Sequence, residues 1–98
     1  MRKNSFPNQL FQLGHLVFTG GAMGLISRTG TTVSSLLGRH SFGDWGGVCE
    51  SDKRGNDRAV IEGARILSAY ELGAKREMLW VITEADRSAT TFLLPEEY

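Results

Sequence analysis

The chain has 98 residues, of which 41% are hydrophobic and 22% are charged, and this composition predicts one small folded domain and excludes a disordered chain. Its 11 basic and 11 acidic residues give a net charge of zero. A neutral balance argues against a duplex-binding protein, which normally carries a basic excess, and against a DNA mimic, which needs an acidic one.

Cysteine use and hydropathy set the expected location. Cys49 is the single cysteine, so it has no partner for an intramolecular disulfide, and no zinc-type spacing occurs. No apolar run reaches the length of a membrane span, and no phosphate-binding glycine loop or nucleophile elbow is present. We therefore expect a cytoplasmic protein that binds no cofactor and no metal and does not associate with a membrane.

The N-terminal half predicts a flexible arm over residues 1–9, followed by a single domain over residues 10–98. Leu10–Phe18 is apolar and rich in aromatic and β-branched residues, which favours a strand. Thr19 is a candidate N-cap for a helix over Ala22–Arg28.

A second and a third helix are expected next. Val33–His40 has apolar residues at helical spacing after a threonine pair that suits an N-cap. The third helix is expected to begin near Ser51 or Asp52, where acidic side chains suit the helix dipole, and to end at Gly63.

The last third of the chain predicts three strands, over residues 65–72, 78–84 and 89–94, joined by short turns. Consecutive strands joined in this way form an antiparallel meander. The predicted fold class is therefore α+β: short N-terminal helices followed by a three-stranded antiparallel meander, with Leu10–Phe18 as a candidate fourth strand.

The segment around His40 is the first candidate site. A histidine at the end of a helix, close to the carboxylate of Asp44, is suited to general acid–base chemistry near neutral pH. The structural alternative is that His40 caps the last carbonyls of its helix and that Asp44 orders the glycine loop. Trp45, flanked by glycine on one side and next to Asp44, is an anchor for the core or for an interface, and a role in the core is favoured.

The second candidate site is the turn that contains Glu84, Asp86 and Arg87. An arginine at a strand end can hold a phosphate or carboxylate with two parallel hydrogen bonds. The same arginine can pair with Asp86 or Glu84 and fix the turn. The sequence leaves both alternatives open.

Several motifs together resemble a family of short bacterial proteins associated with plasmids and other mobile elements, a family without an assigned activity. The motifs are RH at 39–40, GDWG at 43–46, RILSAY at 65–70, WVITEADRS at 80–88, TT at 90–91 and LPEEY at 94–98. The resemblance covers about residues 13–98 and implies a bacterial cytoplasmic protein in a mobile-element setting. It transfers no catalytic residue.

Two functions from different classes are compatible with these features. The first is a mobile-element accessory protein that acts by binding another macromolecule, such as a host defence or regulatory component. A protein is the favoured partner and RNA is the alternative. The candidate contact residues are Asp44, Trp45, Glu84, Asp86 and Arg87. The second is a small metal-independent ribonuclease with a barnase- or RelE-like order of elements, with His40 as general acid or base and Arg87 as the phosphate-binding group. The second requires both side chains to reach one substrate on one surface. The sequence does not decide whether the protein is an enzyme, and it does not give the oligomeric state.

Overall fold

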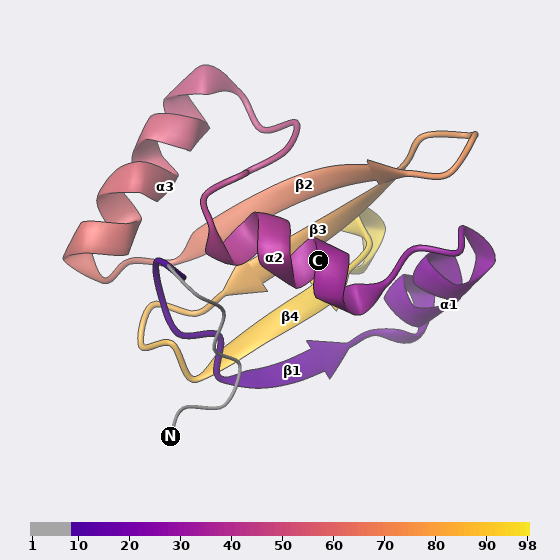
Figure 1. The fold of residues 1–98 in the computed structure, drawn as a ribbon, viewed down its shortest axis with the longest axis horizontal. Helices are drawn as coiled ribbons and strands as arrows, with labels where there is room; N and C mark the ends of the chain where they lie inside the picture. Colours follow the sequence, from indigo (N-terminus) through magenta and orange to yellow (C-terminus); the bar gives the residue numbers. More distant parts are fainter. Residues whose placement is uncertain (1–8) are drawn as a thin grey trace.

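A computed structural model describes residues 9–98 and shows an α+β fold with three α-helices and a four-stranded mixed sheet (Figure 1). The elements are β1 (His15–Phe18), α1 (Gly20–Arg28), α2 (Val33–Ser41), α3 (Glu50–Glu62), β2 (Ile66–Leu72), β3 (Glu77–Thr83), β4 (Ala89–Leu93) and the short 3-10 helix η1 (Pro95–Glu97). The flexible arm predicted over residues 1–9 lies outside the described residues, apart from Gln9.

The sheet has the order β1-β4-β3-β2, and its pairing corrects the predicted topology. Strands β2, β3 and β4 form the predicted antiparallel meander, but β1 pairs with β4 in parallel. The helices are also not confined to the N-terminal part, because β1 precedes them, α3 lies in the middle of the chain and η1 follows the sheet. None of the helices in the described part of the chain has the length and apolar character needed to span a bilayer.

The first strand is shorter than the apolar run that predicted it. Gly14 has a φ of +67°, and a Cβ at this position would lie 2.4 Å from the backbone of Ser88. This left-handed residue interrupts the extended backbone, so pairing begins only at His15. Phe11 and Leu13 still enter the core, but from an irregular segment.

Local capping explains where the helices begin and end. The hydroxyl groups of Thr19 and Thr32 accept hydrogen bonds from the N–H groups of Ala22 and Ser35, so both predicted N-caps are confirmed. Gly63 ends α3 in the left-handed conformation with a φ of +77°, as predicted.

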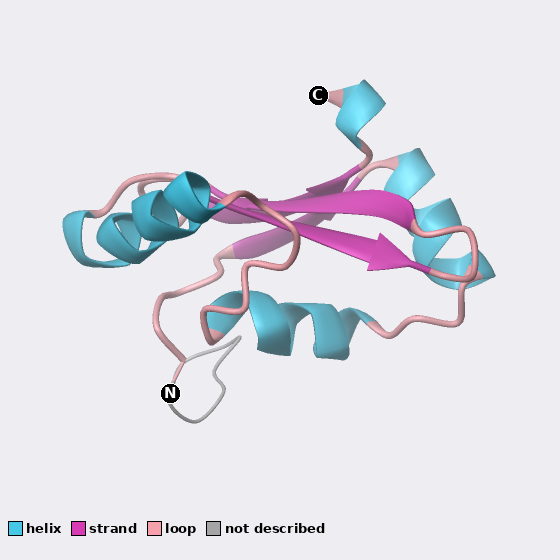
Figure 2. Cartoon of the chain, turned by 90° about the horizontal axis from the view of Figure 1, so that it is seen from above, coloured by secondary structure: helices cyan, strands magenta, loops and turns pink. Residues whose placement is uncertain are grey.

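The sheet has a core face, which is packed against α2. We call its other side the helix-free face, because no α-helix of residues 9–98 covers it and only the short 3-10 helix η1 lies over it. Figure 2 shows α2 below the sheet and η1 above it. Alternate strand residues such as Tyr70, Val81 and Phe92 point to the core face and are fully buried. The helix-free face carries the residues of the other parity: His15, Val17, Leu67, Ala69, Glu71, Met78, Trp80, Ile82, Ala89, Thr91 and Leu93.

The outer edge of β2 is closed by groups from outside the sheet. The N–H of Gly47 donates to the carbonyl of Ala69 (2.7 Å), and the N–H of Ala69 donates to the carbonyl of Trp45 (3.1 Å). The Asn56 side chain of α3 exchanges two hydrogen bonds with the backbone of Leu67, at 2.8 and 3.2 Å. These bonds satisfy edge groups that would otherwise be open to another strand.

The close approach of the loop at residues 45–47 to the backbone of β2 leads to a prediction about stability. A Cβ at Gly46 would lie 2.0 Å from the carbonyl oxygen of Ala69, and the φ of Gly46 is +73°. Gly46→Ala is therefore expected to lower the free energy of unfolding by roughly 2–4 kcal/mol, through backbone strain and loss of the edge contact. Urea unfolding measures this loss.

The adjacent Gly47 supplies the matched control. A Cβ there would meet Ala69 at 3.8 Å, an ordinary van der Waals contact, so Gly47→Ala should change stability by no more than about 0.5 kcal/mol. Equal losses in the two variants would show that the loop does not approach the sheet as described.

Candidate functional site

His40 lies in the core, between α2 and the sheet. Its side chain is fully buried, since it follows Leu36 and Leu37 on the inward side of α2. Its Nδ1 lies 2.6 Å from the Ser68 hydroxyl, and its Nε2 lies 2.9 Å from the Thr83 hydroxyl. The imidazole therefore joins α2 to β2 and β3 and does not cap the carbonyls of its own helix.

The hydrogen-bond chain beyond Thr83 determines the tautomer of His40. The Thr90 hydroxyl donates its single proton to the carbonyl of Leu13 (2.7 Å), so it must accept from Thr83, 2.7 Å away. The proton of Thr83 is then used, so Thr83 accepts from the Nε2–H of His40. The Nδ1 of His40 is left as an acceptor, and Ser68 donates to it.

This environment favours the neutral imidazole. Burial, with a smaller contribution from the positive charge of Arg87, lowers the pKa of His40 from 6.5 to about 3. Both ring nitrogens are occupied and the ring is not exposed, so the side chain has no access to a substrate in this conformation.

Arg87 fixes the end of α3 to the turn between β3 and β4. One guanidinium nitrogen donates to the carbonyl of Ala64 (2.6 Å) and the other donates to the carbonyl of Ala59 (2.9 Å) in the last turn of α3. Further bonds reach the carbonyls of Glu84 (3.2 Å) and Ala85 (3.3 Å). The described contacts of Arg87 are thus to backbone carbonyls, and not to the carboxylates of Asp86 or Glu84 that were the expected partners.

The acidic residues of the same turn have separate positions. A carboxylate oxygen of Asp86 accepts the N–H of Ser88 (3.0 Å), which stabilises the turn. Hydrogen bonding with the Ser88 side chain, and secondly with this N–H, lowers the pKa of the Asp86 carboxyl. Glu84 is exposed, and its carbonyl accepts the N–H of Arg87 (2.9 Å).

The glycine loop is held by its polar side chains. Asp44 pairs with Arg39 (2.7 Å), which lowers the pKa of the carboxyl, and it also accepts the N–H of Gly46 (3.1 Å). Tyr70 donates its hydroxyl proton to the carbonyl of Asp44 (2.6 Å). The buried Trp45 packs in the core, as favoured by the sequence.

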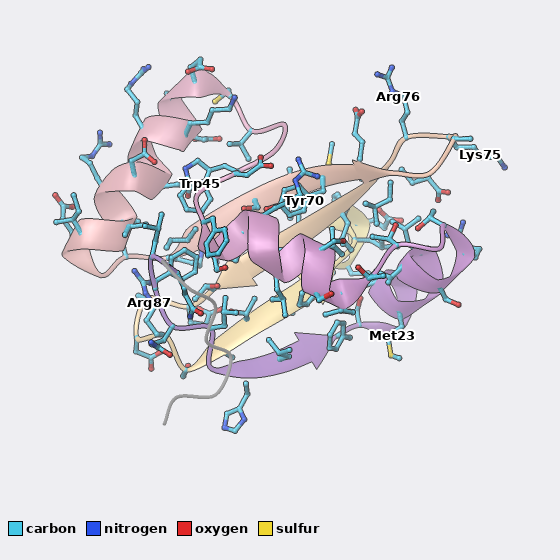
Figure 3. All side chains as sticks on the ribbon, in the orientation of Figure 1. Met23, Trp45, Tyr70, Lys75, Arg76 and Arg87 are labelled. Carbon is cyan, nitrogen blue, oxygen red and sulfur yellow. The ribbon has the colours of Figure 1, made fainter. Side chains whose placement is uncertain are left out.

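The two sequence-predicted catalytic residues are close to a common ring but do not share a surface. The ring of Phe11 lies 5.2 Å from the His40 ring, and the guanidinium of Arg87 lies 5.5 Å from the Phe11 ring. Figure 3 shows Arg87 and Trp45 on the same side of the molecule, near the start of β2. Because His40 is buried, this arrangement lends no support to a ribonuclease that uses this pair.

The sequence reasoning did not identify the polar partners of His40. Ser68, Thr83 and Thr90 occupy core-face positions of three adjacent strands. A polar residue at an inward position of a strand, combined with a histidine on the apolar side of a helix, is the signal that could have located them.

A more accessible cluster lies on the helix-free face. The ring of Tyr98 lies 5.6 Å from the ring of Trp80 in an edge-to-face arrangement, and the guanidinium of Arg65 lies 5.5 Å from the same Tyr98 ring. Tyr98 is 66% exposed, and Trp80 is partly exposed. We call Arg65, Trp80 and Tyr98 the aromatic cluster. These residues lie in motifs of the sequence but were not predicted to form a site, because their proximity depends on the return of η1 over the sheet.

Comparisons with known proteins find no matching family model, no matching curated protein and no matching solved structure. Within residues 9–98, no three His, Cys, Asp or Glu side chains are placed to hold a metal ion.

The pKa of His40 generates a prediction about pH. Because the folded-state pKa is about 3 and the ordinary value is 6.5, the unfolded chain binds a proton between these values that the folded chain does not. Stability should be complete above pH 6.5 and should fall as the pH is lowered toward 3, by about 1.4 kcal/mol for each pH unit. Urea unfolding between about pH 7 and pH 4 measures the slope.

His40→Gln should flatten this slope, since it removes the titrating group. Exposed carboxylates such as Asp86 also have lowered pKa values and contribute to acid sensitivity in both proteins, so the difference between the two slopes reports on His40. NMR of the His40 side chain in the wild-type protein gives an independent measurement of its protonation state. A protonated His40 imidazole in the folded protein near pH 5 would contradict the described network.

The contacts of Arg87 generate a second prediction. Lysine keeps the positive charge but cannot reach the carbonyls of Ala59 and Ala64 with a planar fork. Arg87→Lys is therefore expected to lower the free energy of unfolding by about 1–3 kcal/mol. Arg58→Lys, on an exposed position of α3, is the matched control and should leave the urea midpoint nearly unchanged. Similar midpoints for both variants would contradict the role of Arg87 in holding α3.

Proposed function

We propose that this protein is a small accessory protein that acts by binding another protein through the helix-free face of its sheet. The observation that carries the proposal is the aromatic cluster. Trp80, Tyr98 and Arg65 lie together, partly or largely exposed, on a face that no described α-helix covers. Trp, Tyr and Arg are the side chains most enriched among the residues that dominate binding energy at protein interfaces.

The side chains of the sequence-predicted site residues make internal contacts, and this supports a binding function over catalysis. His40 is neutral and enclosed, and Arg87 is bonded to backbone carbonyls. Asp44 and Trp45 hold the glycine loop. These groups stabilise the fold. A partner is therefore more readily accommodated at the aromatic cluster than at the site residues that the sequence predicted.

The charges around the aromatic cluster favour a protein partner over RNA. Single-stranded RNA binds to sheets on which aromatic side chains are accompanied by a basic groove. Arg65 is the basic residue of this cluster, while Glu71 lies on the same face of β2 and Glu96 is exposed on η1. This mixture of charges suits a polar rim around an apolar centre. The mobile-element setting implied by the sequence resemblance would make the partner a host defence or regulatory component.

A capture experiment with matched variants tests this function. Immobilised wild-type protein is incubated with a bacterial lysate, and enriched proteins are identified by mass spectrometry and then purified for direct binding. Arg65→Glu combined with Tyr98→Ala should weaken binding at least about tenfold, because it removes two anchors of the interface. Both residues are exposed, so the variant should remain folded.

Ile61→Lys supplies the control, since Ile61 is 86% exposed on α3 and is not a member of the aromatic cluster. It should bind as the wild type does. A partner that binds equally well to the Arg65→Glu/Tyr98→Ala variant would contradict the assigned surface. Cleavage of single-stranded RNA in EDTA, abolished by His40→Ala and Arg87→Ala in folded protein, would contradict the function class.

A further inference from the structure

The two edges of the sheet differ in how their backbone groups are satisfied. The outer edge of β2 is closed by the glycine loop and Asn56, whereas β1 forms the opposite edge, and no other strand of residues 9–98 pairs with its outer side. His15 and Thr19 donate their N–H groups toward β4. Strand alternation therefore points the N–H and C=O groups of Leu16 and Phe18 outward, where they form a template for another strand.

The region around this edge carries no formal charge. No Asp, Glu, Lys or Arg occurs from Asn4 to Ser27, a stretch that includes β1 and nearly all of α1. Sheet edges that remain unpaired are commonly protected by charged side chains, and β1 has none. An uncharged edge can also meet its own copy without the repulsion that like charges suffer when they lie directly opposite each other.

Apolar side chains are exposed beside the same edge. Val17 is 45% exposed on the helix-free face. Met23 is 60% exposed and lies near the end of β1 that leads into α1 (Figure 3). A hollow of about 350 Å³, with almost entirely apolar walls, lies next to Met23. It is lined by Phe18, Met23, Ile26, Ser27 and Val33. Absence of charge together with methionine and aromatic side chains is typical of the centre of a protein interface.

We propose that β1 pairs with β1 of a second copy of this chain in an antiparallel, two-fold symmetric dimer. The outward groups determine the register. Leu16 forms a hydrogen-bonded pair with Phe18 of the second copy, and Phe18 forms the equivalent pair with Leu16 of that copy. Val17 then lies directly opposite its own copy on the two-fold axis, in a pair without hydrogen bonds.

This register accounts for both exposed apolar features. Val17 is covered by the Val17 side chain of the second copy on the helix-free face. On the core face, Leu16 of the second copy lies against Phe18, at the edge of the apolar hollow. The two-fold axis is perpendicular to the sheet, so the two helix-free faces lie on the same side of one continuous sheet. The dimer does not depend on the proposed function, but it would present two aromatic clusters to a partner.

The oligomeric state of the full chain tests the proposal. Light scattering coupled to size-exclusion chromatography, over a series of concentrations, should give twice the chain mass of 10.8 kDa for the wild type. Val17→Lys places like charges opposite each other on the axis and should give the mass of the monomer. Val17→Thr keeps a β-branched side chain and should remain a dimer. The exposed position of Val17 allows each variant to fold, which circular dichroism checks.

A disulfide experiment tests the register. In a Cys49→Ser background, Val17→Cys should form a disulfide between two chains on mild oxidation, because directly opposed residues without hydrogen bonds bring their Cα atoms to about 4.5 Å. His15→Cys lies on the same face of the same strand, two residues from the axis, and should not form this disulfide. A monomeric wild type up to millimolar concentration would overturn the proposal. So would a dimer that persists in Val17→Lys, or equal cross-linking at positions 15 and 17.

Discussion

The imidazole of His40 joins segments of the chain that are far apart in sequence. Through Ser68, Thr83 and Thr90 it connects α2 with three strands, and Thr90 extends the connection to the irregular segment at Leu13. Each donor in this series of hydrogen bonds has one acceptor, so the network accommodates only the neutral form of the His40 imidazole. A buried polar network is stabilising only when all its members are satisfied. The position of α2 over the core face, and with it the packing of the aromatic rings around His40, depends on this condition.

The remaining polar motifs hold the periphery of the same core. Arg87 binds the carbonyls at the end of α3, and the glycine loop after Asp44 closes the outer edge of β2. Phe11 links these two peripheral contacts to the core, because its ring packs near the rings of His40 and Trp45 and near the guanidinium of Arg87. The charged turn and the tryptophan loop, which are the most conspicuous polar features of the sequence, therefore have structural roles in this fold.

The two surfaces proposed for binding carry exposed side chains or outward backbone groups. The helix-free face presents the aromatic cluster, and β1 presents backbone groups and apolar side chains without charge. A small neutral domain gains little long-range electrostatic attraction, so its binding energy must come from apolar and aromatic contact and from backbone pairing. Both proposed surfaces are of this kind, and pairing through β1 would place two aromatic clusters on one side of a single sheet.

Local features of the sequence determined the helices, their caps and the antiparallel meander. The signals for these elements, such as Thr19 and Thr32 before a helix and Gly63 after one, act within a few residues and do not require knowledge of the rest of the chain. Only the tertiary structure decided that β1 lies parallel to β4, that His40 points inward and that Arg87 binds carbonyls. These outcomes depend on contacts between distant residues, such as Thr90 with Leu13, which are 77 positions apart. Periodicity indicates that a residue is buried, but the partner it meets is set by how the elements pack.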